Sequence, residues 1–133
     1  MSHAIIGGCH CGEVRYRIRV EPLLQQFCYC TDCTVIGGTD GYAGYIIDAA
    51  GFEVTQGEPK AYTLTSDRGN LIHRKFCSTC GTRLWAEVGG SVSVAAASLD
   101  NPALFKPTRN ILTQSAPPWS RYSDCLHDSK KLQ

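Results

Sequence analysis

Seven of the eight cysteines fall into three short clusters, and their spacing is typical of metal ligands. The clusters are Cys9-His10-Cys11, Cys28-Tyr29-Cys30-Thr31-Asp32-Cys33 and Cys77-Ser78-Thr79-Cys80. Zinc takes four thiolate or imidazole ligands at about 2.0–2.3 Å, and two cysteines on one tight turn can both face the same ion. Cysteines so close in sequence rarely reach the dihedral angle that a disulfide requires. The spacing therefore favours metal binding over a disulfide framework.

The clusters divide into a set of four thiolates and a set of three. Two doublets together supply four thiolates, which is the composition of a closed structural zinc site. The triplet leaves one coordination position for water or substrate, as catalytic zinc sites do. We therefore expect two zinc ions per chain. The expected ligands of the structural zinc are Cys9, Cys11, Cys77 and Cys80. Those of the second, catalytic zinc are Cys28, Cys30 and Cys33.

Two other interpretations of the cysteines stay open at this point. A fourth protein ligand could close the triplet site, and the available donors are Cys125, His127, His10, His73, Asp32 and Asp124. Cys125 could equally be a free thiol. The second interpretation is thiol redox chemistry or metal sensing, with reversible oxidation of the triplet. A C-x-x-C redox motif normally opens a helix, whereas residues 77–80 lie between two strand patterns.

Alternating apolar and polar residues predict a mostly β protein with little helix. Residues 13–20 alternate without a break, with three arginines on one face and apolar side chains on the other. Further strands are expected at 26–29, 42–47, 52–55, 61–65, 71–76, 83–88 and 91–97. Val88-Gly89-Gly90-Ser91 predicts a tight hairpin. Only residues 100–105 suggest a helical turn, capped by Asp100 or Asn101, with Pro102 at its first position.

Length and charge limit the class of protein further. With 133 residues we expect one domain, spanning 1–133. The 13 basic and 12 acidic residues give a formal charge of +1, which argues against a nucleic-acid or membrane-surface partner. No stretch is long and apolar enough to predict a membrane span, and the N-terminus lacks the pattern of a secretory signal. Because reduced thiols persist in the cytosol, we expect a cytoplasmic protein.

The segments around the three clusters resemble the glutathione-dependent formaldehyde-activating (Gfa) family, also called centromere protein V-like. These segments are residues 8–16, 28–33 and 74–85, and the likeness extends to Ser98-Leu99-Asp100-Asn101-Pro102 and Pro118-Trp119. The resemblance implies a β-tent, in which antiparallel sheets fold around zinc-cysteine knuckles, with the same division of zinc ligands. It also implies a carbon–sulfur lyase similar to S-(hydroxymethyl)glutathione synthase, with glutathione and formaldehyde as its small-molecule partners.

Two positions depart from that family's pattern. After Cys33 the family usually carries basic residues, whereas this chain has Thr34-Val35-Ile36-Gly37-Gly38. Asn110 stands where a histidine often precedes Ile111. Arg109 could supply the positive charge that suits an anionic substrate such as glutathione.

Three thiolate ligands weaken the Lewis acidity of zinc, which favours activation of the thiol over activation of the aldehyde. A zinc-binding interaction module without catalysis is the alternative function.

Overall fold

The computed structural model describes residues 4–38, 40–121 and 127–129, which form two β-sheets. The strands of the smaller sheet are β1 (Ile5–Gly8), β2 (Arg15–Ile18) and β5 (Phe52–Gln56). Those of the larger sheet are β3 (Leu24–Cys28), β4 (Tyr42–Asp48), β6 (Lys60–Thr65), β7 (Leu71–Phe76), β8 (Arg83–Val88), β9 (Ser91–Ala95), β10 (Arg109–Ile111) and β11 (His127–Ser129). Their orders are β1-β2-β5 and β11-β10-β3-β4-β9-β8-β7-β6.

Helical structure in the described residues is limited to one α-helix and four short 3₁₀ turns. The helix is α1 (Thr31–Gly37), and the turns are η1 (Ala49–Gly51), η2 (Ala96–Ser98), η3 (Pro102–Leu104) and η4 (Thr113–Ser115). No helix among the described residues has the length and apolar character needed to cross a bilayer.

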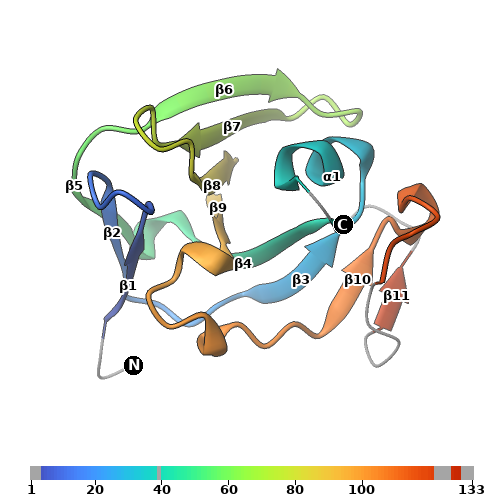
Figure 1. Ribbon diagram of the computed structural model, residues 1–133. Helices are drawn as coiled ribbons and strands as arrows, with labels where there is room; N and C mark the ends of the chain where they lie inside the picture. The colour runs from blue at the N-terminus through green and yellow to red at the C-terminus, as the bar shows by residue number, and fades with distance from the viewer. Residues whose placement is uncertain (1–3, 39, 122–126, 130–133) are drawn as a thin grey trace.

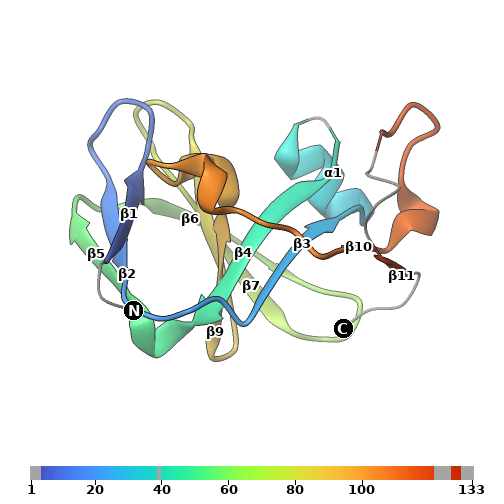
Figure 2. The ribbon, with the colours of Figure 1, turned by 90° about the horizontal axis from the view of Figure 1, so that it is seen from below.

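The larger sheet bends strongly, so its two halves face each other. In Figure 1, β6 and β7 run across the top, β3 and β4 lie lower, and β8 and β9 connect the two levels. The smaller sheet stands at one end, and α1 lies near the other end, under β7. Figure 2 shows the same separation from below, with β1 and α1 on opposite sides of the molecule.

The main hydrophobic core lies between the smaller sheet and the middle strands of the larger one. Alternation along the strands produces it: Tyr16 and Ile18 of β2 are buried, and so are Val92 and Val94 of β9. The residues between them on each strand are more exposed. Burial of one face of each sheet is the main stabilising contribution in such a fold.

Tyr16 is the central contact of this core. Its ring lies 5.5 Å from that of Phe52 and 6.0 Å from that of Trp85, in a T-shaped arrangement with the latter. Its buried hydroxyl is 2.6 Å from the Ser98 hydroxyl, and Ser98 in turn donates to the Ala95 carbonyl. The tyrosine therefore joins the smaller sheet to the η2 turn.

The expected mostly β class is confirmed, and all eight predicted strand regions contain strands. The Val88–Ser91 hairpin is present with these two residues paired, and the Asn101 side chain caps the η3 turn with Pro102 inside it. Helix α1 was not predicted, because its seven residues are too few to show a helical repeat. The sheets are also not purely antiparallel, since β10 pairs in parallel with both β3 and β11.

A first prediction concerns Gly7, where β1 passes close to Tyr16. A Cβ atom there would overlap the Tyr16 hydroxyl oxygen and lie 2.5 Å from the Ser98 carbonyl oxygen. We expect Gly7→Ala to lower the free energy of unfolding by about 1–3 kcal/mol, the usual cost of overpacking. Urea denaturation measures this. Gly90→Ala is the control, because a methyl group at that position would meet nothing within 4 Å; equal stability of both variants would contradict the prediction.

Candidate metal centres and the adjoining cavity

Two tight turns bring four cysteines together. Cys9 and Cys11 lie in the turn between β1 and β2, and Cys77 and Cys80 lie in the turn between β7 and β8. Each turn closes through a glycine with positive φ: the amide of Gly12 donates to the Cys9 carbonyl, and that of Gly81 to the Cys77 carbonyl. Left-handed backbone suits glycine because other residues clash there. The sequence pattern Cys-x-Cys-Gly and Cys-x-x-Cys-Gly thus builds two matching knuckles.

The four sulfur atoms fit a tetrahedral metal site. They lie within 4.8 Å of one another, with Sγ of Cys11 at 3.6 Å from that of Cys9 and 3.7 Å from that of Cys77. A tetrahedron with bonds of about 2.3 Å has edges of about 3.8 Å, whereas a disulfide needs about 2.05 Å. All four cysteines are free. Cys9 and Cys77 are buried, whereas Cys11 and Cys80 are exposed.

Three further sulfurs gather where β3 meets α1. Cys28 ends β3, Cys30 is the N-cap residue of α1, and Cys33 lies in its first turn. The Cys33 amide donates to Cys30 Sγ at 3.2 Å, so the helix start itself fixes two of the sulfurs. The three sulfurs lie within 4.8 Å of one another, and all three cysteines are free. This cluster, too, could hold a metal ion.

The triplet is more enclosed than the four-cysteine cluster. Cys33 is buried, and Cys28 and Cys30 are half-buried. Hydrogen bonds from Cys28 and Cys33 lower the pKa of Cys30 to about 2, whereas the contacts with Cys30 and Cys33, together with burial, raise the pKa of Cys28. Three sulfurs at this distance repel one another as thiolates, so a divalent cation is the natural way to hold all three deprotonated.

A buried arginine from β7 completes the surroundings of the triplet. Arg74 Nη2 donates to Cys33 Sγ at 3.5 Å, and its guanidinium carbon lies 5.7 Å from the centre of the Tyr42 ring. Burial acts to lower the pKa of Arg74, but the charge and hydrogen bond of Cys33 outweigh it, so the net pKa is raised. Sequence reasoning missed Arg74, because its approach to Cys33 depends on how β7 and α1 pack.

The other donors considered from the sequence lie apart from the triplet or outside the described residues. His10 is exposed beside the four-cysteine cluster, where its amide donates to Thr82. His73 Nδ1 lies 2.8 Å from the Thr63 hydroxyl. No aspartate, glutamate or histidine joins Cys28, Cys30 and Cys33 within the described part of the chain, Asp32 included. Asp124 and Cys125, and the side chain of His127, lie outside that part.

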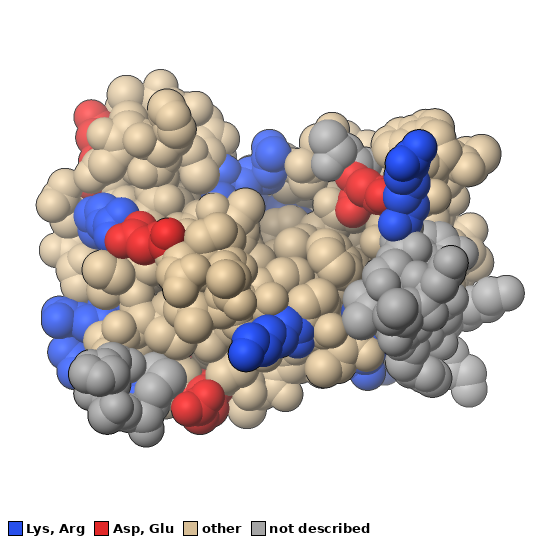
Figure 3. Space-filling model, turned by 60° about the horizontal axis from the view of Figure 1, so that its bottom comes forward, with Lys and Arg blue, Asp and Glu red and all other residues tan. Residues whose placement is uncertain are grey.

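A cavity of about 640 Å³ lies beside the four-cysteine cluster; Cys9 lines it, whereas Cys28, Cys30 and Cys33 are not among its lining residues. Gly8, Cys9 and His10 line one side, from the turn that carries the four-cysteine cluster. The opposite side is lined by Phe27, Gly37, Asp40, Gly41, Tyr42 and Ala43, from the segments that flank the triplet in the sequence. Figure 3 shows this face hollowed, with basic side chains at the back of the hollow. Phe27 precedes Cys28, and Tyr42 pairs with Cys28 in the sheet, so the cavity lies against the strand ends that carry the triplet.

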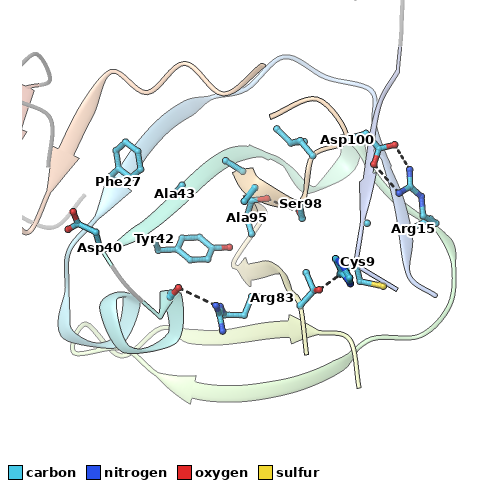
Figure 4. A pocket seen from close by; sticks show the side chains of 18 residues that line it. Cys9, Arg15, Phe27, Asp40, Tyr42, Ala43, Arg83, Ala95, Ser98 and Asp100 are labelled. Atoms are coloured by element: carbon cyan, nitrogen blue, oxygen red, sulfur yellow. Dashed lines mark hydrogen bonds and ion pairs between the residues drawn. The ribbon is translucent and has the colours of Figure 1, made fainter. Parts of the chain in front are cut away.

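Two arginines with different partners line this cavity (Figure 4). Arg15 forms a bidentate ion pair with Asp100, at 3.0 and 2.5 Å. Arg83 donates through Nη2 to the Gly37 carbonyl at 3.1 Å, which caps the end of α1. In Figure 4 its side chain points toward α1, below Tyr42. Arg109, the cation considered from the sequence, donates instead to Gln26 at 3.0 Å and is not among the cavity-lining residues.

The rim of the cavity is tied to a distant segment through Asp40. Its carboxylate accepts hydrogen bonds from the Ser120 hydroxyl and, at 2.8 Å, from the Arg121 amide. Nearby, Asn110 is fully buried opposite Phe27. Leu112 follows with a left-handed backbone (φ 56°), a conformation that costs roughly 1–2 kcal/mol for a residue with a side chain. The Asp40 contacts hold residues 120 and 121 at the rim of the cavity, and the pairing of β10 with β3 places Asn110 beside Phe27.

The fold and the two clusters define a small, mostly β protein that could bind two metal ions through cysteine. The model of the family described as "Glutathione-dependent formaldehyde-activating enzyme" matches residues 4–115. The chain belongs to this family.

Two known proteins illustrate the likeness. A protein of Halomonas elongata named "Putative glutathione-dependent formaldehyde-activating enzyme" is 30% identical over 122 residues, covering 85% of this chain and 77% of its own. A crystal structure of a Rhodobacter sphaeroides protein superposes with a TM-score of 0.62 at 21% identity, covering 77% of this chain and 96% of the other. The likeness to the Rhodobacter sphaeroides structure shows a shared fold and nothing more.

The two clusters differ in what they connect, and this difference generates a prediction. The four-cysteine cluster joins turns of the two different sheets, whereas the triplet lies within one local segment. We expect Cys77→Ser to lower the free energy of unfolding by several kcal/mol, on the order of a structural metal's contribution. Cys30→Ser should remove one metal ion and leave the fold intact, since serine also caps helices well.

Metal content by mass spectrometry and melting curves by circular dichroism measure both effects. An unfolded Cys30→Ser variant alongside a stable Cys77→Ser variant would reverse the assignment of the two centres.

Proposed function

We propose that this protein is a zinc-dependent carbon–sulfur lyase that joins glutathione to formaldehyde, giving S-(hydroxymethyl)glutathione. The observation that carries the proposal is the triplet of sulfurs together with a 640 Å³ cavity that is lined by the neighbouring Phe27, Gly37 and Tyr42. Three protein donors leave a coordination position open, and the cavity volume is within the usual range for small-molecule sites. Membership of the family supports the same reaction. A cytoplasmic location, where glutathione is kept reduced, is part of the proposal.

Zinc is the proposed metal at both centres. The ligands would be Cys9, Cys11, Cys77 and Cys80 for a structural ion, and Cys28, Cys30 and Cys33 for a catalytic one. Thiolate donors in tetrahedral spacing suit zinc, which also needs no change of oxidation state for this reaction. A zinc ion at the triplet would supply a positive centre with one open position, able to favour the deprotonated form of a thiol.

The reaction itself is an addition with no oxidant or reductant. The sulfur of glutathione forms a bond to the carbonyl carbon of formaldehyde, the carbon–oxygen double bond becomes a single bond, and the thiol proton ends on the new hydroxyl group. The chain's own contribution is to hold the thiol near the triplet, to place the rest of glutathione in the cavity and to limit the access of water.

Arg83 is the proposed recognition residue for a glutathione carboxylate. One of its terminal nitrogens is used by the Gly37 carbonyl, and a guanidinium has further donors that can bind a carboxylate. Arg15, in contrast, is already paired with Asp100 in a bidentate contact. Arg83 thereby offers the positive charge that the segment after Cys33 lacks.

The activity is tested by adding glutathione and ¹³C-formaldehyde and following the hydroxymethyl adduct by NMR exchange spectroscopy. We expect the two-zinc protein to accelerate formation and exchange of the adduct above the spontaneous rate. Cys30→Ser should bring the rate down to that spontaneous value. Lys60→Gln, an exposed substitution on β6, is the control and should keep the full rate. A two-zinc protein that never exceeds the spontaneous rate contradicts the proposal and favours an interaction module.

A further prediction separates substrate recognition from the chemical step. We expect Arg83→Gln to raise the KM for glutathione about tenfold, since a hydrogen bond between charged groups contributes about 1.5–3 kcal/mol and this one is partly screened by solvent. The rate with 2-mercaptoethanol, a thiol without carboxylates, should not change. An equal loss with both thiols would show that Arg83 acts through the position of α1, which it caps, and not through the substrate.

A further inference from the structure

We propose that Arg74 is a positioning residue for the three-cysteine centre: its buried guanidinium balances the thiolate charge and fixes Cys33, and thereby sets how tightly this centre holds its metal. The inference deepens the proposed function, on which it rests for the identity of the metal. It concerns a residue on β7 that lies 41 positions from Cys33 in the sequence.

The contacts of Arg74 leave its charge without a carboxylate partner. Only 9% of the residue is exposed, and its Nη2 donates to Cys33 Sγ at 3.5 Å. Its guanidinium lies near the ring of Tyr42, whose hydroxyl donates to the Ser93 carbonyl at 3.0 Å. Among the described residues no ion pair joins Arg74 to an aspartate or glutamate, and its Nε has no hydrogen-bond partner.

A buried, unpaired arginine would be costly, so its compensation must lie in the sulfurs. Arginine stays protonated in proteins, and burying its charge without an opposite charge is strongly unfavourable. The group in contact with the guanidinium that can carry a negative charge is the Cys33 sulfur, 3.5 Å from Nη2. Arg74 and the triplet therefore stabilise each other, and neither is easily buried alone.

Counting charges shows why the triplet needs this partner. Three thiolates and one divalent ion carry a net charge of minus one, and Arg74 brings the buried group to neutrality. The four-cysteine cluster carries more negative charge, but Cys11 and Cys80 are exposed to water. The groups that contact its sulfurs are uncharged, unlike Arg74. The Val14 amide donates to Cys9 Sγ, and the Thr82 hydroxyl lies 3.2 Å from Cys80 Sγ. Solvent can stabilise the charge of that cluster but reaches the triplet much less.

Neutrality at the triplet has a consequence for the substrate. An incoming glutathione thiolate would meet a neutral centre when Arg74 is present and a negatively charged one when it is absent. The N–H···S contact would also withdraw electron density from Cys33, so that a metal held there would accept a fourth ligand more readily. Arg74 would then favour binding of both the metal and the anionic sulfur.

The test is the zinc affinity of each centre, measured with zinc alone by competition against a chromophoric chelator. We expect Arg74→Gln to weaken one of the two zinc sites roughly 10- to 100-fold, the usual effect of losing a group that supports a metal ligand. The other site should keep its affinity. Arg74→Met keeps the apolar stem without the charge and should show the same loss. Arg74→Lys keeps the charge and should recover most of the affinity.

Lys75→Gln is the matched control, because it removes one positive charge from the next position of β7. Lys75 is 3.9 Å from Glu87 rather than in contact with a sulfur, so both zinc affinities should stay unchanged. Equal zinc affinity in the wild type and in a folded Arg74→Gln or Arg74→Met variant would overturn the inference, and so would a parallel loss at both sites. These outcomes do not depend on adduct formation, so failure of the proposed reaction is recognised separately.

Discussion

The convergence of four sulfur atoms from two turns is the constraint on which the rest of this structure depends. Cys11 and Cys77 are 66 positions apart in the sequence, yet their sulfurs lie 3.7 Å apart. This contact joins the β1–β2 turn of the smaller sheet to the β7–β8 turn of the larger one. Because the two sheets also share the core around Tyr16, the sulfurs and the apolar side chains position the same two layers. The turn that carries Cys9 and Cys11 also forms one wall of the cavity, through Gly8, Cys9 and His10.

The charge of the triplet is balanced in a different way from that of the four-cysteine cluster. The triplet is enclosed, so its thiolates need a buried counter charge, whereas the exposed half of the four-cysteine cluster is solvated. Arg74 supplies that charge from β7, and Tyr42 lies both against its guanidinium and in the cavity lining. The Tyr42 ring therefore lies both beside Arg74, which contacts the triplet, and at the cavity.

Much of the fold could be predicted from the sequence because the strands alternate strictly. Residues 13–20 and 91–97 show the period of two that one-sided burial imposes, and both contain strands. One helix and three strands escaped prediction for physical reasons. α1 spans only seven residues, β1 reads as a short apolar run before two glycines, and β10 and β11 have three residues each. Each is stabilised by pairing or packing with distant segments, which local patterns do not record.

The candidate site likewise contains residues that could be predicted from the sequence and residues that could not. The seven clustered cysteines were recognisable because their spacing is local, and the structure brings them together in the expected sets of four and three. The cations around them were not recognisable, since the positions of Arg74 and Arg83 depend on the register of β7 with β8 and on how these strands meet α1. Arg109, chosen for its place in the sequence, is held instead by Gln26. Local spacing thus identifies ligands that share a turn, whereas the charges that control such ligands come from strands whose neighbours only the folded sheet determines.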